Sequence, residues 1–307
     1  MSFRNDSPDE SSATSAPVWP AAGSTSYYAL LHCSDAASAS AHSTLELINT
    51  ISQVLSNVSE PAVAEQKVHW WHEELARLAN GNARHPASVA WHERMLANTG
   101  SLQPVKSLTQ KWLAVLSCNA NERFANATDD EAFRQRVEDD YSARLQLLAA
   151  AIATADNSSA TMEKALSADI ARGLGLCHRL RQFNHLQSAG VMVWPDSLYQ
   201  KYELKPESLY DAASREQLMN LFRQVTDEAV ESLLSGLSSQ KTDNTVDNTD
   251  VLENADTTIL IASTLRLQQM KMWQKKRPDF LREYQGLTPF RKSLVTWRTR
   301  RRLAKQR

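Results

Sequence analysis

Histidine and acidic side chains that could bind a metal ion are concentrated in one early segment. His69 and His72 lie three residues apart with Glu73 beside them, and His85 and His92 follow. Zinc in proteins is held by histidine, cysteine and carboxylate groups that converge on one point. The segment lacks the His-Glu-x-x-His spacing that places two ligands and a general base on one helix face. The sequence therefore favours a structural role here over a zinc site.

Other cysteine and histidine residues could act as nucleophiles or as general bases. Cys33, Cys118 and Cys177 show no paired spacing, which indicates neither a disulfide framework nor a zinc motif. They stand among apolar or small residues, so we interpret them as packing residues. His178 and His185 lie seven residues apart, and we expect them to line an interior cavity. A role as general base is the alternative.

The elements that must position these groups are predicted to be helices. The chain has 307 residues, 42% of them hydrophobic, and only eight glycines. A chain of this length can bury one large core. Apolar residues recur at helical spacing in several series, which include Leu45, Ile48, Ile51, Leu55 and Val58; Val68, Trp71, Leu75 and Leu78; and Leu218, Leu221, Val225 and Ala229. This periodicity predicts an all-α protein.

Two segments lack helical periodicity. Residues 1–22 are rich in Ser, Asp, Pro and Ala, have neither the basic start nor the apolar stretch of a secretory signal, and predict a disordered tail. Residues 238–257 are polar and low in complexity, which predicts a mobile loop between two helices, with a regulatory insertion as the alternative. No stretch approaches 18 consecutive apolar residues, so no membrane span is predicted. Together with the unpaired cysteines, this favours a cytoplasmic location.

Positive charge is concentrated at the carboxyl end. The last 17 residues hold eight Lys or Arg and no acid; because the whole chain has a net charge of −1, the remainder carries −9. Apolar side chains fall at i, i+4 and i+7 among these cations. The residues concerned are Phe290, Leu294 and Trp297, with Arg291, Lys292 and Arg298 beside them. The pattern predicts a basic amphipathic helix over residues 288–307, able to lie on an anionic surface of the inner membrane.

Other interpretations of this basic end are a plain solvated terminus and a surface for a partner protein. No recognition motif accompanies the charge, so we do not expect a nucleic-acid partner.

Three segments, in order, resemble the squalene/phytoene synthase family. Lys67-Val-His-Trp-Trp-His-Glu-Glu-Leu and the following Gly81-Asn-Ala-Arg-His-Pro are similar to its Trp-rich helix and turn. Gly173-Leu-Gly-Leu-Cys-His-Arg-Leu leads to Trp194-Pro195, and Gly286-Leu-Thr-Pro-Phe-Arg-Lys resembles the closing segment of its bacterial, hopanoid-associated branch. The resemblance implies that residues 23–307 form one domain, an isoprenoid-synthase type helical bundle around a central cavity.

The resemblance also implies an aspartate-rich motif on each of two facing helices. In the family these motifs hold Mg²⁺, which neutralises the diphosphate as it leaves. At the first motif this sequence has Ser52, Gln53 and Ser56, and Asn49 replaces the arginine before it. These side chains offer no negative charge to a hydrated dication.

The second acidic motif is missing as well. The segment between Arg179 and Pro195 is shorter than the family pattern, and Gln182, His185 and Leu186 stand in the region of the lost motif. No cofactor is therefore expected. The alternative is that nearby acids serve as ligands instead, namely Glu46, Glu60 or Asp169. They would have to converge on one ion.

The resemblance implies that further residues face the phosphate of the ligand or the central cavity. They are Thr25 and Tyr28 in the early Thr25-Ser-Tyr-Tyr, Asn49, Arg123 and His178. We expect a non-catalytic relative that binds an isoprenoid or lipid, or that assists assembly of a partner protein, as a similar mitochondrial branch does for respiratory complex I. One alternative is an active Mg²⁺-dependent transferase that condenses two prenyl diphosphates head to head, as squalene, presqualene and phytoene synthases do. The other is a membrane-peripheral scaffold without a ligand.

Overall fold

The computed structural model describes residues 21–58, 60–124, 127, 129–156, 167–188, 190–242, 254–277 and 286–305. Over these ranges the regular structure is entirely helical, as predicted. The elements are α1 (Thr25–Leu30), α2 (Asp35–Ser56), α3 (Pro61–Ala79), α4 (Pro86–Thr99), α5 (Gln103–Phe124), α6 (Asp130–Ala155), α7 (Ala168–Ser188), α8 (Asp196–Lys201), η1 (Pro206–Ser208), η2 (Ala212–Ser214), α9 (Arg215–Thr242), α10 (Asn254–Lys276) and α11 (Pro289–Ala304).

The loop predicted between two helices is narrower than residues 238–257. Helix α9 continues to Thr242, and α10 begins at Asn254. The polar composition of these helical ends led to the prediction of a loop. An exposed helix turn can consist of polar residues alone, so composition does not reveal it. The residues between the two helices, and most of the predicted tail at 1–22, lie outside the described ranges.

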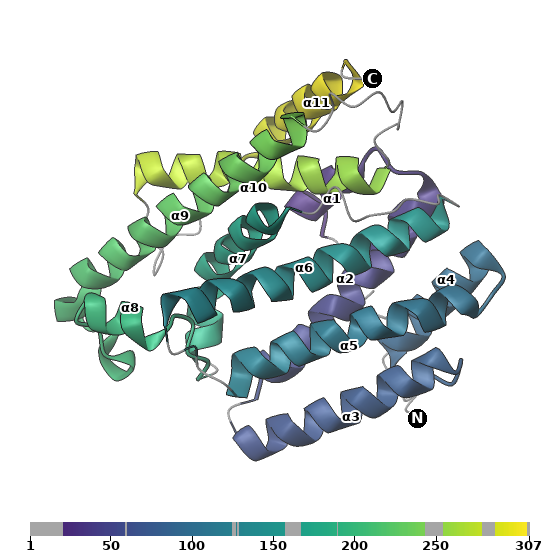
Figure 1. Ribbon diagram of the computed structural model, residues 1–307, viewed down its shortest axis with the longest axis horizontal. Helices are drawn as coiled ribbons and strands as arrows, with labels where there is room; N and C mark the ends of the chain where they lie inside the picture. The colour runs from purple at the N-terminus through teal and green to yellow at the C-terminus, as the bar shows by residue number, and fades with distance from the viewer. Residues whose placement is uncertain are drawn as a thin grey trace, which may run out of the picture.

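Helix α6 is the central element of the bundle. It packs against α2, α4 and α5 on one side and against α7 and α10 on the other, and α9 covers α7 and α10 (Figure 1). The interior is therefore divided into two apolar clusters that meet at α6. One, among α2 to α6, contains the paired rings of Trp91 and Trp112, whose centroids lie 5.4 Å apart. The other joins α6, α7, α9 and α10, where Phe183 and Phe222 meet edge to face at 4.9 Å.

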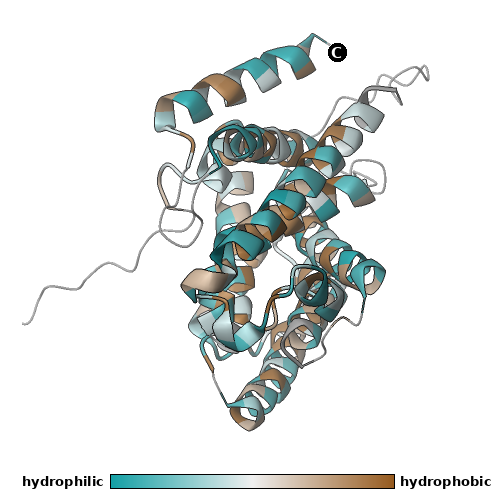
Figure 2. Cartoon of the chain, turned by 90° about the vertical axis from the view of Figure 1, so that its left-hand side faces the viewer, coloured by the Kyte–Doolittle hydropathy of each residue, from teal (hydrophilic) through white to brown (hydrophobic). Residues whose placement is uncertain are grey.

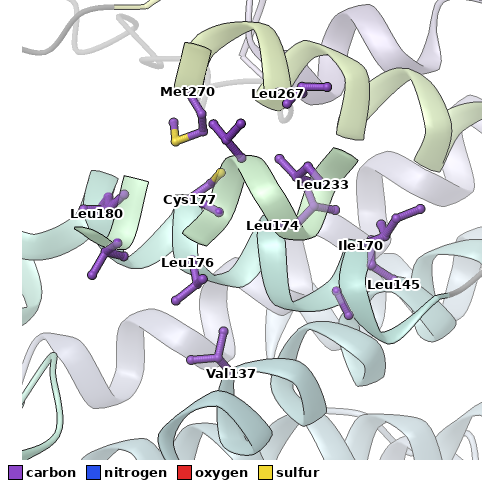
Figure 3. Close-up of a cluster of buried hydrophobic side chains, with 14 of the residues drawn as sticks. Val137, Leu145, Ile170, Leu174, Leu176, Cys177, Leu180, Leu233, Leu267 and Met270 are labelled. Atoms are coloured by element: carbon purple, nitrogen blue, oxygen red, sulfur yellow. The ribbon is translucent and has the colours of Figure 1, made fainter. Parts of the chain in front are cut away.

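Two glycines allow α7 to approach its neighbours closely. A Cβ atom on Gly173 would lie 2.6 Å from Cγ of Leu233 on α9, and one on Gly175 would overlap the side chain of Val137 on α6. Figure 3 shows α7 held between these helices, with Cys177 pointing toward α10. The Gly-Leu-Gly-Leu segment noted in the sequence is therefore a packing device.

Helix α11 lies on the outside of the bundle, against α1 and α10 (Figure 2). Thr288 caps its first turn and Pro289 follows, the order of residues that favours a helix start. Beneath it, Tyr28 and Leu287 pack with Ile261 and Leu265 in a small apolar cluster. This helix confirms the one predicted within residues 288–307.

Candidate functional site

Aromatic and basic side chains of α6 and α7 meet in the interior of the bundle. On α6, Tyr141 and Arg144 are three residues apart and so share a helix face; the guanidinium carbon of Arg144 lies 5.7 Å from the centre of the Tyr141 ring. On α7, His178 and Arg181 have the same spacing. The rings of Tyr141 and His178 lie 5.6 Å apart and join the two helices. Arg266 of α10 adds a third basic group near them. We call Tyr141, Arg144, His178, Arg181 and Arg266 the cationic interior.

A guanidinium group lies beside Ser52, the first position at which the resemblance predicts a metal-binding acid. Ser52 Oγ accepts a hydrogen bond of 3.1 Å from Arg144 Nη1 and donates one of 2.8 Å to the Ile48 carbonyl. Arg144 Nε donates to Asp140 Oδ1 at 2.8 Å, and its Nη2 donates to Asn119 Oδ1 at 3.1 Å. Asp140 is buried and compensates this one arginine. The side chains at this position do not fit Mg²⁺.

The imidazole of His178 is held in its neutral form. Burial lowers its pKa well below 6.5, and the positive charges of Arg144, Arg181, Arg179 and Arg266 lower it further. A neutral imidazole can donate one hydrogen bond and accept another. The cationic interior therefore combines fixed positive charge with a neutral donor.

Burial also keeps Tyr141 and the neighbouring Cys177 of α7 uncharged near neutrality. Burial raises the pKa of Tyr141 to about 12. It does the same for Cys177, whose pKa rises to about 12. A thiol with such a pKa is not a nucleophile near neutrality, which supports the interpretation of Cys177 as a packing residue.

The region of the lost second motif has apolar or exposed side chains. Leu186 is buried in the larger core, Gln182 is half-buried and His185 is exposed. Seven residues span about 10 Å along a helix, so His185 lies beyond the enclosed part of α7. The expectation that His185 shares a cavity lining with His178 is therefore wrong. Arg179 points elsewhere: its Nη1 donates to the Val193 carbonyl at 3.1 Å.

The other residues that the sequence suggested as site residues lie in different parts of the chain and differ in exposure. On α2, Asn49 is half-buried and Gln53 is exposed. The side chains of Ser56 and Arg123 lie outside the described residues. Thr25 and Tyr28 are buried on α1, which packs against α10 and α11.

The acids proposed as substitute metal ligands do not meet. Glu46 and Glu60 are exposed. Asp169 lies at the first turn of α7, where it accepts a 2.5 Å hydrogen bond from Ser235. Over the described ranges, no three His, Cys, Asp or Glu side chains are grouped so that they could hold a metal ion.

The early histidine-rich segment is organised by a carboxylate that sequence reasoning did not single out. Glu74 is fully buried, and its Oε1 accepts 2.7 Å hydrogen bonds from the backbone N–H groups of Arg84 and His85. Its Oε2 accepts from Arg77 at 3.0 Å. Burial alone would raise the pKa of Glu74, but these donors outweigh it and lower the pKa. His85 Nδ1 in turn accepts from the Ala87 N–H at the start of α4.

Comparison with known proteins agrees with this architecture. A family model described as squalene/phytoene synthase matches residues 20–282. A solved structure, titled crystal structure of a dehydrosqualene synthase in complex with ligand, superposes with a TM-score of 0.67 over 92% of each chain, at 10% identity. No curated protein sequence matches significantly. Among the described helices, none is both long and apolar enough to cross a bilayer.

The helical order and the interior between α6, α7 and α10 place the molecule in the all-α isoprenoid-synthase fold. The chain belongs to the squalene/phytoene synthase family.

Proposed function

We propose that this family member is non-catalytic and that its cationic interior binds the anionic head of an isoprenoid or lipid phosphate without Mg²⁺. The observation that supports the proposal is the hydrogen bond from Arg144 to Ser52, the residue at which the resemblance predicts a metal-binding acid. A Mg²⁺ ion about 5 Å from a guanidinium would be repelled by roughly 7 kcal/mol at an effective dielectric constant near 20. Asp140 is paired with this arginine and offsets part of its charge.

The same groups suit an anionic ligand. Guanidinium groups match phosphate oxygens through paired N–H donors and stay charged at all relevant pH values. Arg181 and Arg266 act on His178 with positive charge from α7 and α10, so an anion there would relieve repulsion among like charges.

The cations also argue against prenyl transfer. The family's reaction needs Mg²⁺ to neutralise the diphosphate as it leaves, and a guanidinium at this place repels that ion. The interior can hold a diphosphate, but it is not suited to drive the diphosphate away. The proposal therefore favours binding over turnover.

The test uses purified full-length protein and farnesyl diphosphate. Binding is followed by calorimetry, and pyrophosphate release is assayed in parallel, each with Mg²⁺ and with EDTA. We expect binding in EDTA and no pyrophosphate release. The Arg181→Gln and Arg266→Gln variants should each bind about tenfold more weakly, because each loses a charged hydrogen-bond donor. Arg223→Gln, an exposed arginine of α9 that bonds to Asn220, is the matched control and should bind as wild type.

Two outcomes would overturn the proposal. Mg²⁺-dependent pyrophosphate release would identify a working transferase with other metal ligands. If the protein in EDTA binds neither farnesyl diphosphate nor a long-chain lipid phosphate, the proposed binding of an isoprenoid or lipid phosphate is wrong.

A further inference from the structure

Helix α11 has an inner face that packs on the bundle. Thr296, Thr299 and Leu303, at i, i+3 and i+7, are buried against it. Lys292 is also turned inward: its Nζ donates to the Gly23 carbonyl at 2.5 Å and lies 5.9 Å from the centre of the Tyr28 ring. These contacts fix the rotation of the helix about its own axis.

The opposite face of α11 presents an apolar row. Phe290, Leu294, Trp297 and Arg301 fall at i, i+4, i+7 and i+11, which keeps them on one side of a helix. Phe290 is 79% exposed and Trp297 is 55% exposed. The guanidinium of Arg301 lies over the Trp297 ring, 5.3 Å from its centre. Figure 2 shows the resulting alternation of hydrophilic and hydrophobic turns along the helix.

Arginines flank this row along its length. Arg291, Arg298 and Arg302, at i, i+7 and i+11, are all exposed. The described end of the chain, residues 286–305, contains no acidic residue. Because the chain up to residue 290 carries a net charge of −9, this end of the sequence has a net charge opposite in sign to that of the remainder.

We propose that this outer face of α11 rests on an anionic lipid bilayer, with the Phe290 and Trp297 rings at the level of the headgroups. Charge complementarity selects the occupant. The flanking arginines attract anionic lipid, while the net negative charge of the rest of the chain disfavours other orientations. An apolar row between cations fits a bilayer interface. No nucleic-acid recognition motif accompanies the charge.

This inference goes beyond the proposed function, because it concerns a surface and not the interior. The two could act together if the ligand is a membrane lipid, yet either can stand without the other. Their tests are therefore separate.

Flotation with vesicles measures the binding of the protein to a lipid bilayer and so tests the inference. The full-length protein is mixed with vesicles of phosphatidylcholine alone, or of phosphatidylcholine with phosphatidylglycerol. We expect flotation with the anionic vesicles, and less of it as ionic strength rises. Two paired variants remove different parts of the face: Phe290→Ser with Trp297→Ser, and Arg298→Gln with Arg302→Gln. Each pair should reduce partitioning roughly 10- to 30-fold.

Matched controls change similar residues elsewhere. Tyr210→Ser removes an aromatic ring that is 56% exposed, and Lys275→Gln with Lys276→Gln removes two exposed cations at the end of α10. These variants should float as wild type. Circular dichroism checks that every variant is folded.

Three results would overturn the inference: no flotation of the wild type with anionic vesicles, equal losses in the control variants, or unchanged flotation of both α11 pairs. Binding to a nucleic acid without binding to vesicles would show that the cations serve another partner.

Discussion

The two halves of the bundle differ in the groups that surround their buried titratable side chains. Among α2 to α5, the buried charge of Glu74 is surrounded by donors that neutralise it. Between α6, α7 and α10, several arginines act on one neutral histidine with the same sign of charge. A buried charge with its donors in place holds a turn, whereas like charges that act together on one buried group favour an anion beside them. The contrast separates a structural polar site from a candidate binding site.

This contrast also changes the meaning of the histidines. His85 helps to begin α4 and lies beside the Trp-rich helix, where its ring is 4.9 Å from that of Trp71. His178 instead faces Tyr141 and the arginines of the interior. Residue type alone does not distinguish the two roles.

The largest effect is expected from removal of the structural carboxylate. Glu74→Ala should lower the free energy of unfolding by about 2–4 kcal/mol, because two buried N–H groups each lose their acceptor. Urea denaturation followed by circular dichroism measures this. Glu93→Ala, at an exposed position of α4, is the control and should change stability by less than about 0.5 kcal/mol. A loss for Glu74→Ala as small as that of the control would contradict the structural role.

A smaller effect is expected from the acid of the cationic interior. Asp140→Asn should cost about 1–3 kcal/mol, because Arg144 is left partly buried without its paired carboxylate. The same change should tighten anion binding, since the interior becomes more positive. Asp139→Asn, at the exposed neighbouring position, controls for helix effects. Weaker anion binding by Asp140→Asn would break the comparison between the two halves.

The smallest change in stability is expected at Arg181. Arg181→Gln should alter the free energy of unfolding by less than about 1 kcal/mol, because loss of a partner is offset by relief of like-charge repulsion. It should also raise the pKa of His178 toward 6.5, as followed by NMR with His178→Gln for assignment. Arg223→Gln should leave that pKa unchanged.

The direction of the accompanying pH effect follows from the lowered pKa. Below pH 6.5 the unfolded chain binds a proton at His178 that the folded chain does not, so this group lowers stability as pH falls. The loss should be shallower in Arg181→Gln. A fall as steep as in the wild type would mean that Arg181 does not act on His178.

Much of the architecture could be predicted from the sequence. The helical spacing of residues such as Trp71, Leu75 and Leu78 predicted buried faces, and all three are buried. The ordered combination of the Trp-rich helix, the Gly173 segment and the closing Gly286 segment indicated the family. The uncharged side chains of Ser52 and Gln53, where the resemblance predicts acids, can also be read directly from the sequence.

The cationic interior could be predicted only in part. Asp140 and Arg144, four residues apart on one helix, are a readable pair. The contact of this pair with Ser52 could not be predicted, because Arg144 and Ser52 are 92 residues apart in the sequence. The same holds for Glu74, whose acceptor role depends on a backbone turn ten residues away.

The sequence by itself determined the helices and the family, since these depend on local periodicity and residue type. Only the tertiary structure decided that Arg144 stands beside Ser52, that His178 is neutral while His185 is exposed, and that α11 turns Phe290 and Trp297 outward. The reason is physical: burial and charge at a site are set by groups from several helices, whose approach depends on packing of the whole core.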